Sequence, residues 1–223
     1  MGCAAIYLIL TFLIFLPFLF AQLITGAFII LGFSPEVAVF LLIAVILGGM
    51  INIPVKKWKT PPREIQNRGP FSFFKRAINP RPRILAVNVG GAIVPGLVSI
   101  WQIYRIYTEF IYRNPGLIVV FPMILAMNIF ISYKIAKPVE GKGIVMPAFI
   151  PPVFVAFASI MFYPAVAPVI AFPAGVLGVL IGADLMHLKD IKNLNAPIGS
   201  IGGAGTFDGI FLCGVFSVLL SAI

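Results

Sequence analysis

Long runs of apolar residues, separated by shorter polar segments, recur along the whole chain of 223 residues. Each run is about as long as the roughly 20 residues that a helix needs to cross the hydrocarbon core of a membrane. Helices satisfy their backbone polar groups internally, as lipid requires. The pattern therefore predicts an all-α, polytopic bundle of about seven transmembrane helices. The predicted spans are residues 5–32, 36–55, 85–107, 116–135, 144–163, 165–187 and 200–222.

The composition agrees with a chain embedded in lipid. Hydrophobic residues make up 61% of the sequence and charged residues only 10%, which is too little charge to cover a soluble domain of this size. No segment outside the apolar runs is long enough to form a second domain, so residues 1–223 are predicted to be one integral membrane domain. The sequence has no nucleotide-binding loop, nucleophilic triad or CxxC metal pattern, and we expect no metal and no organic cofactor.

The basic residues are unevenly distributed over the predicted connections. The second connection, residues 56–84, holds nine Lys and Arg residues, while the fourth holds three, the sixth two and the third two. Lys and Arg concentrate in cytoplasmic loops, which predicts a cytoplasmic N-terminus and cytoplasmic even-numbered connections. This placement accounts for the net charge of +9 without nucleic acid as a partner.

The long second connection is rich in proline and contains the sequence FSFFKR. Phenylalanines beside Lys75 and Arg76 suit a segment that lies on a leaflet of anionic lipids. The lipid bilayer, and anionic lipids at this basic loop, are therefore expected partners. The alternative interpretation is a loop that only sets the topology.

Two acidic residues, Asp184 and Asp208, fall within the last two predicted spans. An ionisable residue in a membrane span is costly and by default indicates a functional site. The two spans are joined by a short connection, so both aspartates are predicted in the cytoplasmic half, with Asp208 about eight residues, or roughly 12 Å, into its helix. Two carboxyl groups close together share one proton and titrate as a unit.

Such a pair can activate water with its ionised member and a substrate carbonyl with its protonated member. Around it, five residues are expected to play supporting parts: His187, Gly203, Gly205, Thr206 and Gly209. His187 lies one turn after Asp184 and could relay a proton or serve only as an interfacial residue. A metal site formed by His187 and the two aspartates is conceivable, although this set lacks a full complement of ligands.

Each aspartate also has a structural interpretation. Asp184 could pair with Lys189 or Lys192 near a helix end. Asp208 could bond to the backbone or to a buried asparagine such as Asn88 or Asn128.

The segments PVEGKGIVMPAFIPP and IGGAGTFDGIFL resemble a family of archaeal and bacterial multi-spanning membrane proteins of unknown function. This resemblance implies the cytoplasmic (inner) membrane of a prokaryote. In addition, GADLMHL is similar to the GxGDxKL-type signature of prepilin peptidases, and Gly203-Ala-Gly205 before Asp208 resembles the GxGD element of presenilins and signal peptide peptidases. That second resemblance implies catalytic aspartates on two consecutive helices. The sequence departs from it in that two residues separate the GxG from Asp208, and no PAL motif is present.

The leading hypothesis is an intramembrane aspartyl protease that uses Asp184 and Asp208 to cleave membrane-embedded or membrane-proximal peptides. The alternative is a proton- or cation-coupled transporter in which the same aspartates carry the coupling proton and proline-broken helices line the path. A third possibility is a structural or lipid-sensing membrane protein.

Overall fold

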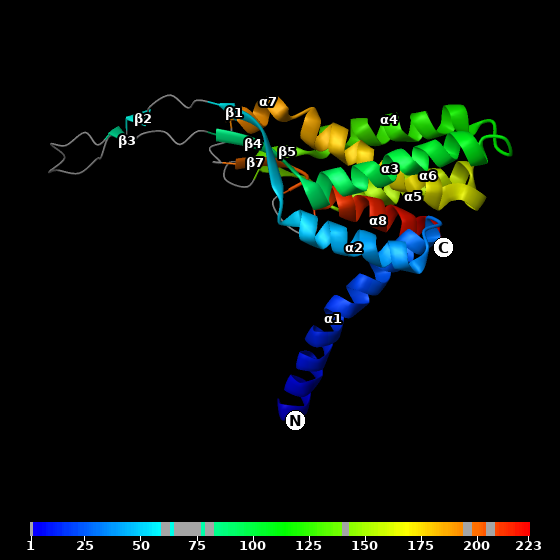
Figure 1. Ribbon diagram of the computed structural model, residues 1–223, viewed down its shortest axis with the longest axis horizontal. Helices are drawn as coiled ribbons and strands as arrows, with labels where there is room; N and C mark the ends of the chain where they lie inside the picture. Colours follow the sequence, from blue (N-terminus) through cyan, green and yellow to red (C-terminus); the bar gives the residue numbers. More distant parts are fainter. Residues whose placement is uncertain are drawn as a thin grey trace.

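The computed structural model describes residues 2–58, 63–64, 77–78, 83–139, 143–193, 198–203 and 208–223. Within these ranges the chain is mostly helical (Figure 1). The α-helices are α1 (Gly2–Ile30), α2 (Pro35–Gly49), α3 (Val94–Arg105), α4 (Leu117–Ile135), α5 (Ile150–Phe162), α6 (Ala167–Val179), α7 (Leu188–Asn193) and α8 (Gly209–Ser221). Short π-helical or 3-10 segments adjoin some of them: η1 (Val89–Ile93), η2 (Ile106–Phe110), η3 (Pro164–Val166) and η4 (Leu180–Leu185).

Four helical stretches of the described chain are long and apolar enough to cross a membrane. They are Thr11–Ile30, Val89–Phe110, Leu117–Ile135 and Pro164–Asp190. Three further apolar helices, α2, α5 and α8, have only 13 to 15 residues. Each predicted span overlaps one of these stretches, and such a set of apolar helices is typical of a membrane protein.

A small sheet forms at one end of the bundle, which the all-α prediction did not include. Strands β1 (Asn52–Trp58), β4 (Arg83–Asn88) and β7 (Ile198–Ile201) pair in the order β1-β4-β7. β4 is antiparallel to β1 and parallel to β7. The sheet therefore brings the second and sixth connections together at the same end of the molecule, on the left in Figure 1.

Two smaller strand pairs also lie in the connections. β2 (Arg63–Glu64) pairs with β3 (Ala77–Ile78), and β5 (Lys137–Val139) pairs with β6 (Gly143–Val145).

Several predicted spans are shorter than expected because their apolar ends are strands or turns. The second was predicted to reach residue 55, but α2 ends at Gly49 and β1 follows. The third was predicted from residue 85, which lies in β4. The last was predicted from residue 200, but α8 begins at Gly209. The parts of β1 and β4 that fell within the predicted spans, residues 53–55 and 85–87, are apolar, so hydrophobicity alone could not separate strand from helix there.

Helix α6 lies at the centre of the bundle. Nearly all of its side chains are buried, and it packs against α3, α4, α5 and α8. A helix that is hydrophobic all round must be enclosed by others. In this core the rings of Phe28, Phe172 and Phe211 meet, with the Phe28 centroid 6.3 Å from each of the other two. The first half of α1 projects away from the bundle (Figure 1).

Two glycines set the close packing of the central helix on α4. A Cβ atom at Gly178 would overlap Asn128, and one at Gly182 would overlap the backbone carbonyl of Ile129. Small residues spaced four apart let membrane helices approach closely. This contact fixes one end of the helical stretch Pro164–Asp190, which we call the central stretch and which contains Asp184.

Candidate functional site

Asp184 lies in the π-helical segment η4, which continues the central helix towards the sheet. Its side chain is half-buried, and its Oδ2 accepts a hydrogen bond from the Gly202 N–H at 2.9 Å. Asp184 forms no ion pair among the described side chains, which include Lys189. The side chain of Lys192 lies outside that set. Asp184 therefore fixes the chain just after β7 rather than pairing with Lys189.

Asp208 is the N-cap residue of α8. Its backbone is extended (φ −84°, ψ 157°), and its Oδ2 accepts a hydrogen bond from the Ile210 N–H at 3.3 Å. Aspartate is among the preferred N-cap residues because it satisfies a free backbone N–H at the start of a helix. The prediction that Asp208 lies about eight residues inside its helix is wrong, because the chain before it turns instead of continuing as a helix.

That turn is formed by Gly202 and Gly203, which we call the glycine turn. Their φ angles are +78° and +70°, a conformation that side-chain-bearing residues rarely adopt. Asp184 holds the Gly202 amide, while Gly203 packs directly against the Asp208 carboxyl group. Both aspartates are thus at the glycine turn.

The contacts of the two carboxyl groups converge on the consecutive residues Gly202 and Gly203. No direct hydrogen bond joins them among the described contacts; each is anchored to a backbone amide. The structural alternative of a backbone bond to Asp208 is therefore present, and sharing of a proton by the two carboxyl groups stays a prediction.

The start of η1 forms the wall of this site, and sequence reasoning missed it. A Cβ atom at Gly91 would overlap the Gly202 carbonyl oxygen and would lie 3.0 Å from the Asp208 Cβ. The Gly91 N–H donates to Asn88 Oδ1 at 2.7 Å, which caps the segment. The signal in the sequence was the pair Gly90-Gly91 after a capping asparagine and an apolar strand.

Neither asparagine considered for Asp208 bonds to it. Asn88 donates to the Gly49 carbonyl at 2.8 Å and to Asn52 Oδ1 at 3.2 Å. Asn128 donates to the Ala174 carbonyl at 2.9 Å.

Among the residues expected to support the pair, His187 turns towards α4. Its Nδ1 lies 2.9 Å from the Ala183 carbonyl oxygen, and its ring lies 4.9 Å from that of Tyr133. Gly203 contacts Asp208, as described above, and Gly209 is exposed at the start of α8. Gly205, Thr206, Lys75 and Arg76 lie outside the described residues. No group of three or more His, Cys, Asp or Glu side chains gathers in the part of the chain that the structure describes.

The comparison with protein families covers this site. A family model described as "Protein of unknown function (DUF1614)" matches residues 46–220. The chain belongs to the DUF1614 family. The matched range includes both aspartates and the three strands of the sheet, and membership of an uncharacterised family, as the sequence predicted, is confirmed. No curated protein and no solved structure matched the chain.

Proposed function

We propose that this DUF1614 protein is an intramembrane aspartyl peptidase with Asp184 and Asp208 as its catalytic pair. One observation carries the proposal: two acidic side chains from different helical stretches reach the same glycine turn, although the described chain has few other acidic residues. Asp184 ends the central helix and Asp208 begins α8, so both are placed by rigid elements.

The reaction needs no group beyond the pair and a water molecule. The ionised carboxylate removes a proton from water as the water oxygen attacks the carbonyl carbon of the scissile peptide bond. The protonated carboxyl group donates its proton to the carbonyl oxygen, which gives a neutral gem-diol. The C–N bond then breaks as the nitrogen receives a proton from the carboxyl group that took it from water. The gem-diol returns its hydroxyl proton to the other carboxylate, which restores the starting state of the pair.

The strand β7 supports a peptide as the substrate class. Among the described strands it pairs only with β4, so it is an edge strand, and it runs directly into the glycine turn. Extended peptides bind to sheet edges through their backbone groups. A peptide held along β7 in this way would pass the two aspartates in the extended form that hydrolysis requires.

The membrane arrangement is part of the same proposal. All seven apolar stretches cross the membrane, with the sheet end and the N-terminus in the cytoplasm of a prokaryote. The positive-inside rule supports this orientation, because 14 of the 16 Lys and Arg residues lie in the even-numbered connections. The basic loop, with Lys75 and Arg76, would then lie on the anionic lipids of the cytoplasmic leaflet.

The test compares cleavage by the reconstituted protein and by single variants, using a panel of single-span peptides in liposomes. Asp184→Asn and Asp208→Asn each remove an ionisable group at nearly constant size, and asparagine also serves as an N-cap. We expect each to lower the cleavage rate by at least about a thousandfold, as is usual when a member of a catalytic unit is lost. The matched control is Asp190→Asn, in the neighbouring helix α7, and it should leave the rate unchanged.

Unchanged cleavage in both variants would overturn the proposal. So would a parent protein that cleaves none of the peptides but carries a proton flux that Asp208→Asn abolishes, which is the result expected of a coupled transporter.

A further inference from the structure

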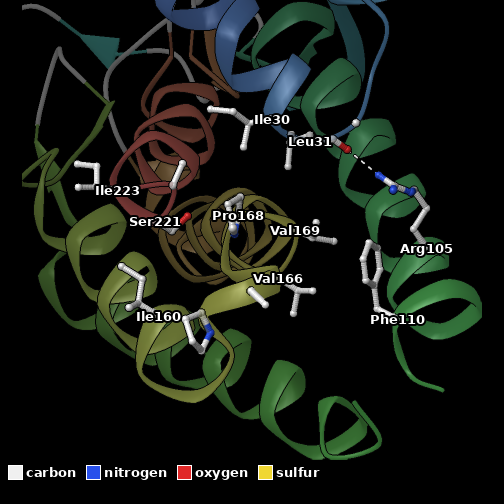
Figure 2. Close-up of a pocket in the computed structure, with 14 residues that line it drawn as sticks. Ile30, Leu31, Arg105, Phe110, Ile160, Val166, Pro168, Val169, Ser221 and Ile223 are labelled. Carbon is white, nitrogen blue, oxygen red and sulfur yellow. Dashed lines mark hydrogen bonds between the residues drawn. The ribbon is translucent and has the colours of Figure 1, made fainter. Parts of the chain in front are cut away.

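A cavity of about 660 Å³ lies at the end of the bundle opposite the aspartates (Figure 2). The central stretch begins beside this cavity at Pro164 and ends near Asp184, while α8 begins after Asp208 and ends at the cavity with Ser221. The ends of α1, α3 and α5 complete its wall. A cavity of this volume is within the range of small-molecule binding sites.

Among the described residues that line this cavity, Arg105 is the only Lys or Arg. Its Nη1 donates to the Leu31 carbonyl oxygen at 2.6 Å (Figure 2). Its Nε donates to Glu109 Oε2 at 3.0 Å. Nη2 has no hydrogen-bond partner among the described residues. The guanidinium group is therefore held in place with two N–H donors still free for an anion.

The negative charge of Glu109 does not cancel the attraction of the Arg105 guanidinium group for an anion. Glu109 is outside the cavity lining, and its side chain is 50% exposed, against 18% for Arg105. Water therefore screens the glutamate more strongly than the arginine. The N-terminal end of the central helix, which borders the cavity, adds a partial positive charge.

The remaining wall is mainly apolar and continues onto the outer face of the bundle. Phe110, Val166 and Val169 line the interior, and Ile160 lies at the side of α5. Ile160 is itself exposed at the outer face of the bundle, so the apolar wall extends to a surface that lipid would cover. A soluble anion would gain nothing from such a wall, whereas an acyl chain would.

We propose that this cavity binds an anionic phospholipid, with the phosphate on Arg105 and the upper part of one acyl chain against Val166, Val169 and Ile160. Guanidinium groups bind phosphate through paired N–H donors. The lipid belongs to the leaflet opposite the aspartate pair. This site is independent of the proposed peptidase activity.

Native mass spectrometry of the full chain in neutral detergent tests the proposal. Phosphatidylglycerol and phosphatidylcholine with identical chains are compared as probes, with glycerol 3-phosphate as the soluble headgroup. We expect phosphatidylglycerol to bind more tightly than phosphatidylcholine, and Arg105→Gln to weaken its binding about tenfold through the lost charge-assisted bonds. Arg113→Gln is the matched control, because it removes an exposed positive charge at the same end of the bundle but outside the cavity.

A second variant tests the acyl-chain part without touching the arginine. Ala165 is an exposed residue of the lining, and Ala165→Trp would fill the cavity without disturbing the core. It should weaken the binding of phosphatidylglycerol, whether or not Arg105→Gln folds.

Three results would each overturn the proposal. They are equal binding of the two lipids by the parent, an equal effect of Arg105→Gln and Arg113→Gln, and binding of glycerol 3-phosphate as tight as that of phosphatidylglycerol. The last result would indicate a site for a free anion rather than for a lipid.

Discussion

The two ends of the bundle hold their charges in opposite ways. At the sheet end, two carboxyl groups accept hydrogen bonds from the backbone amides of Gly202 and Ile210. At the cavity end, the guanidinium group of Arg105 donates to the backbone carbonyl of Leu31. In both places a charged group in a poorly hydrated setting is anchored to backbone dipoles of the opposite sign.

The backbone itself also differs between the ends. The sheet end has the glycine turn with positive φ angles, the π-helical segments η1 and η4, and glycine contacts so close that a Cβ atom would not fit. The cavity end also has a π-helical segment, η2, and a glycine with positive φ, Gly32, but these border open space rather than two carboxyl groups. Irregular backbone that positions carboxyl groups is suited to chemistry, whereas an open apolar cavity with one charge is suited to binding.

The largest expected difference in stability between the ends concerns their buried amide side chains. Asn88 at the sheet end makes three hydrogen bonds. Asn88→Ala would leave the Gly49 carbonyl and the Gly91 N–H without their side-chain hydrogen-bond partner. We expect Asn88→Ala to lower the free energy of unfolding by about 4 kcal/mol, because each buried group left without a partner costs about 1–3 kcal/mol. Unfolding in detergent micelles by a denaturant measures this.

The comparison variant at the cavity end is Gln102→Ala. Gln102 is fully buried and donates to the Leu31 carbonyl at 3.1 Å, but Arg105 also donates to that oxygen. We expect a loss of only about 2 kcal/mol. A larger loss in the free energy of unfolding for Gln102→Ala than for Asn88→Ala would contradict the greater dependence of the sheet end on buried amide hydrogen bonds.

The next effect tests the close packing around the glycine turn. In Gly91→Ala the added methyl group overlaps the Gly202 carbonyl, so either the turn or η1 must move. We expect a loss of about 3 kcal/mol in the free energy of unfolding, as for other overpacked sites. Gly96→Ala is the control, since a Cβ atom at Gly96 of α3 meets nothing within 4 Å. Gly96→Ala should be stabilising by up to about 1 kcal/mol, and a similar value for Gly91→Ala would contradict the packing described.

The smallest effect separates the capping role of Asp208 from its proposed chemistry. Asp208→Ala removes the N-cap of α8 and should cost about 1 kcal/mol, whereas Asp208→Asn should cost only a few tenths. Thermal unfolding of the three proteins in the same detergent measures the difference. If Asp208→Asn is as unstable as Asp208→Ala, a loss of cleavage in the asparagine variant says nothing about catalysis.

The sequence predicted the central helix well and the sheet not at all. The sixth predicted span, residues 165–187, agrees closely with the helical stretch Pro164–Asp190, because an unbroken apolar run of that length has one stable form in lipid. The strands β1, β4 and β7 lie within or beside other apolar runs, where hydropathy does not distinguish strand from helix. Their pairing joins residues far apart in the chain, which no local pattern reveals.

The candidate site was predicted in its residues but not in its geometry. Asp184 and Asp208 stood out because acidic residues are rare in apolar runs. The position of Asp208 was wrong because Gly202 and Gly203 were taken as part of a helix, although two consecutive glycines also permit the positive φ angles of a turn. The contact of Gly91 with that turn depends on the packing of η1 and could not be predicted from spacing.

The most direct test of the catalytic pair is a double-mutant comparison of cleavage rates. The rates of Asp184→Asn, Asp208→Asn and the double variant are measured against the parent with one single-span peptide in liposomes. Residues that act as one unit are strongly non-additive, so the double variant should cleave no more slowly than the slower single variant. If the two losses instead multiply in the double variant, the aspartates act separately and the pair does not share one reaction.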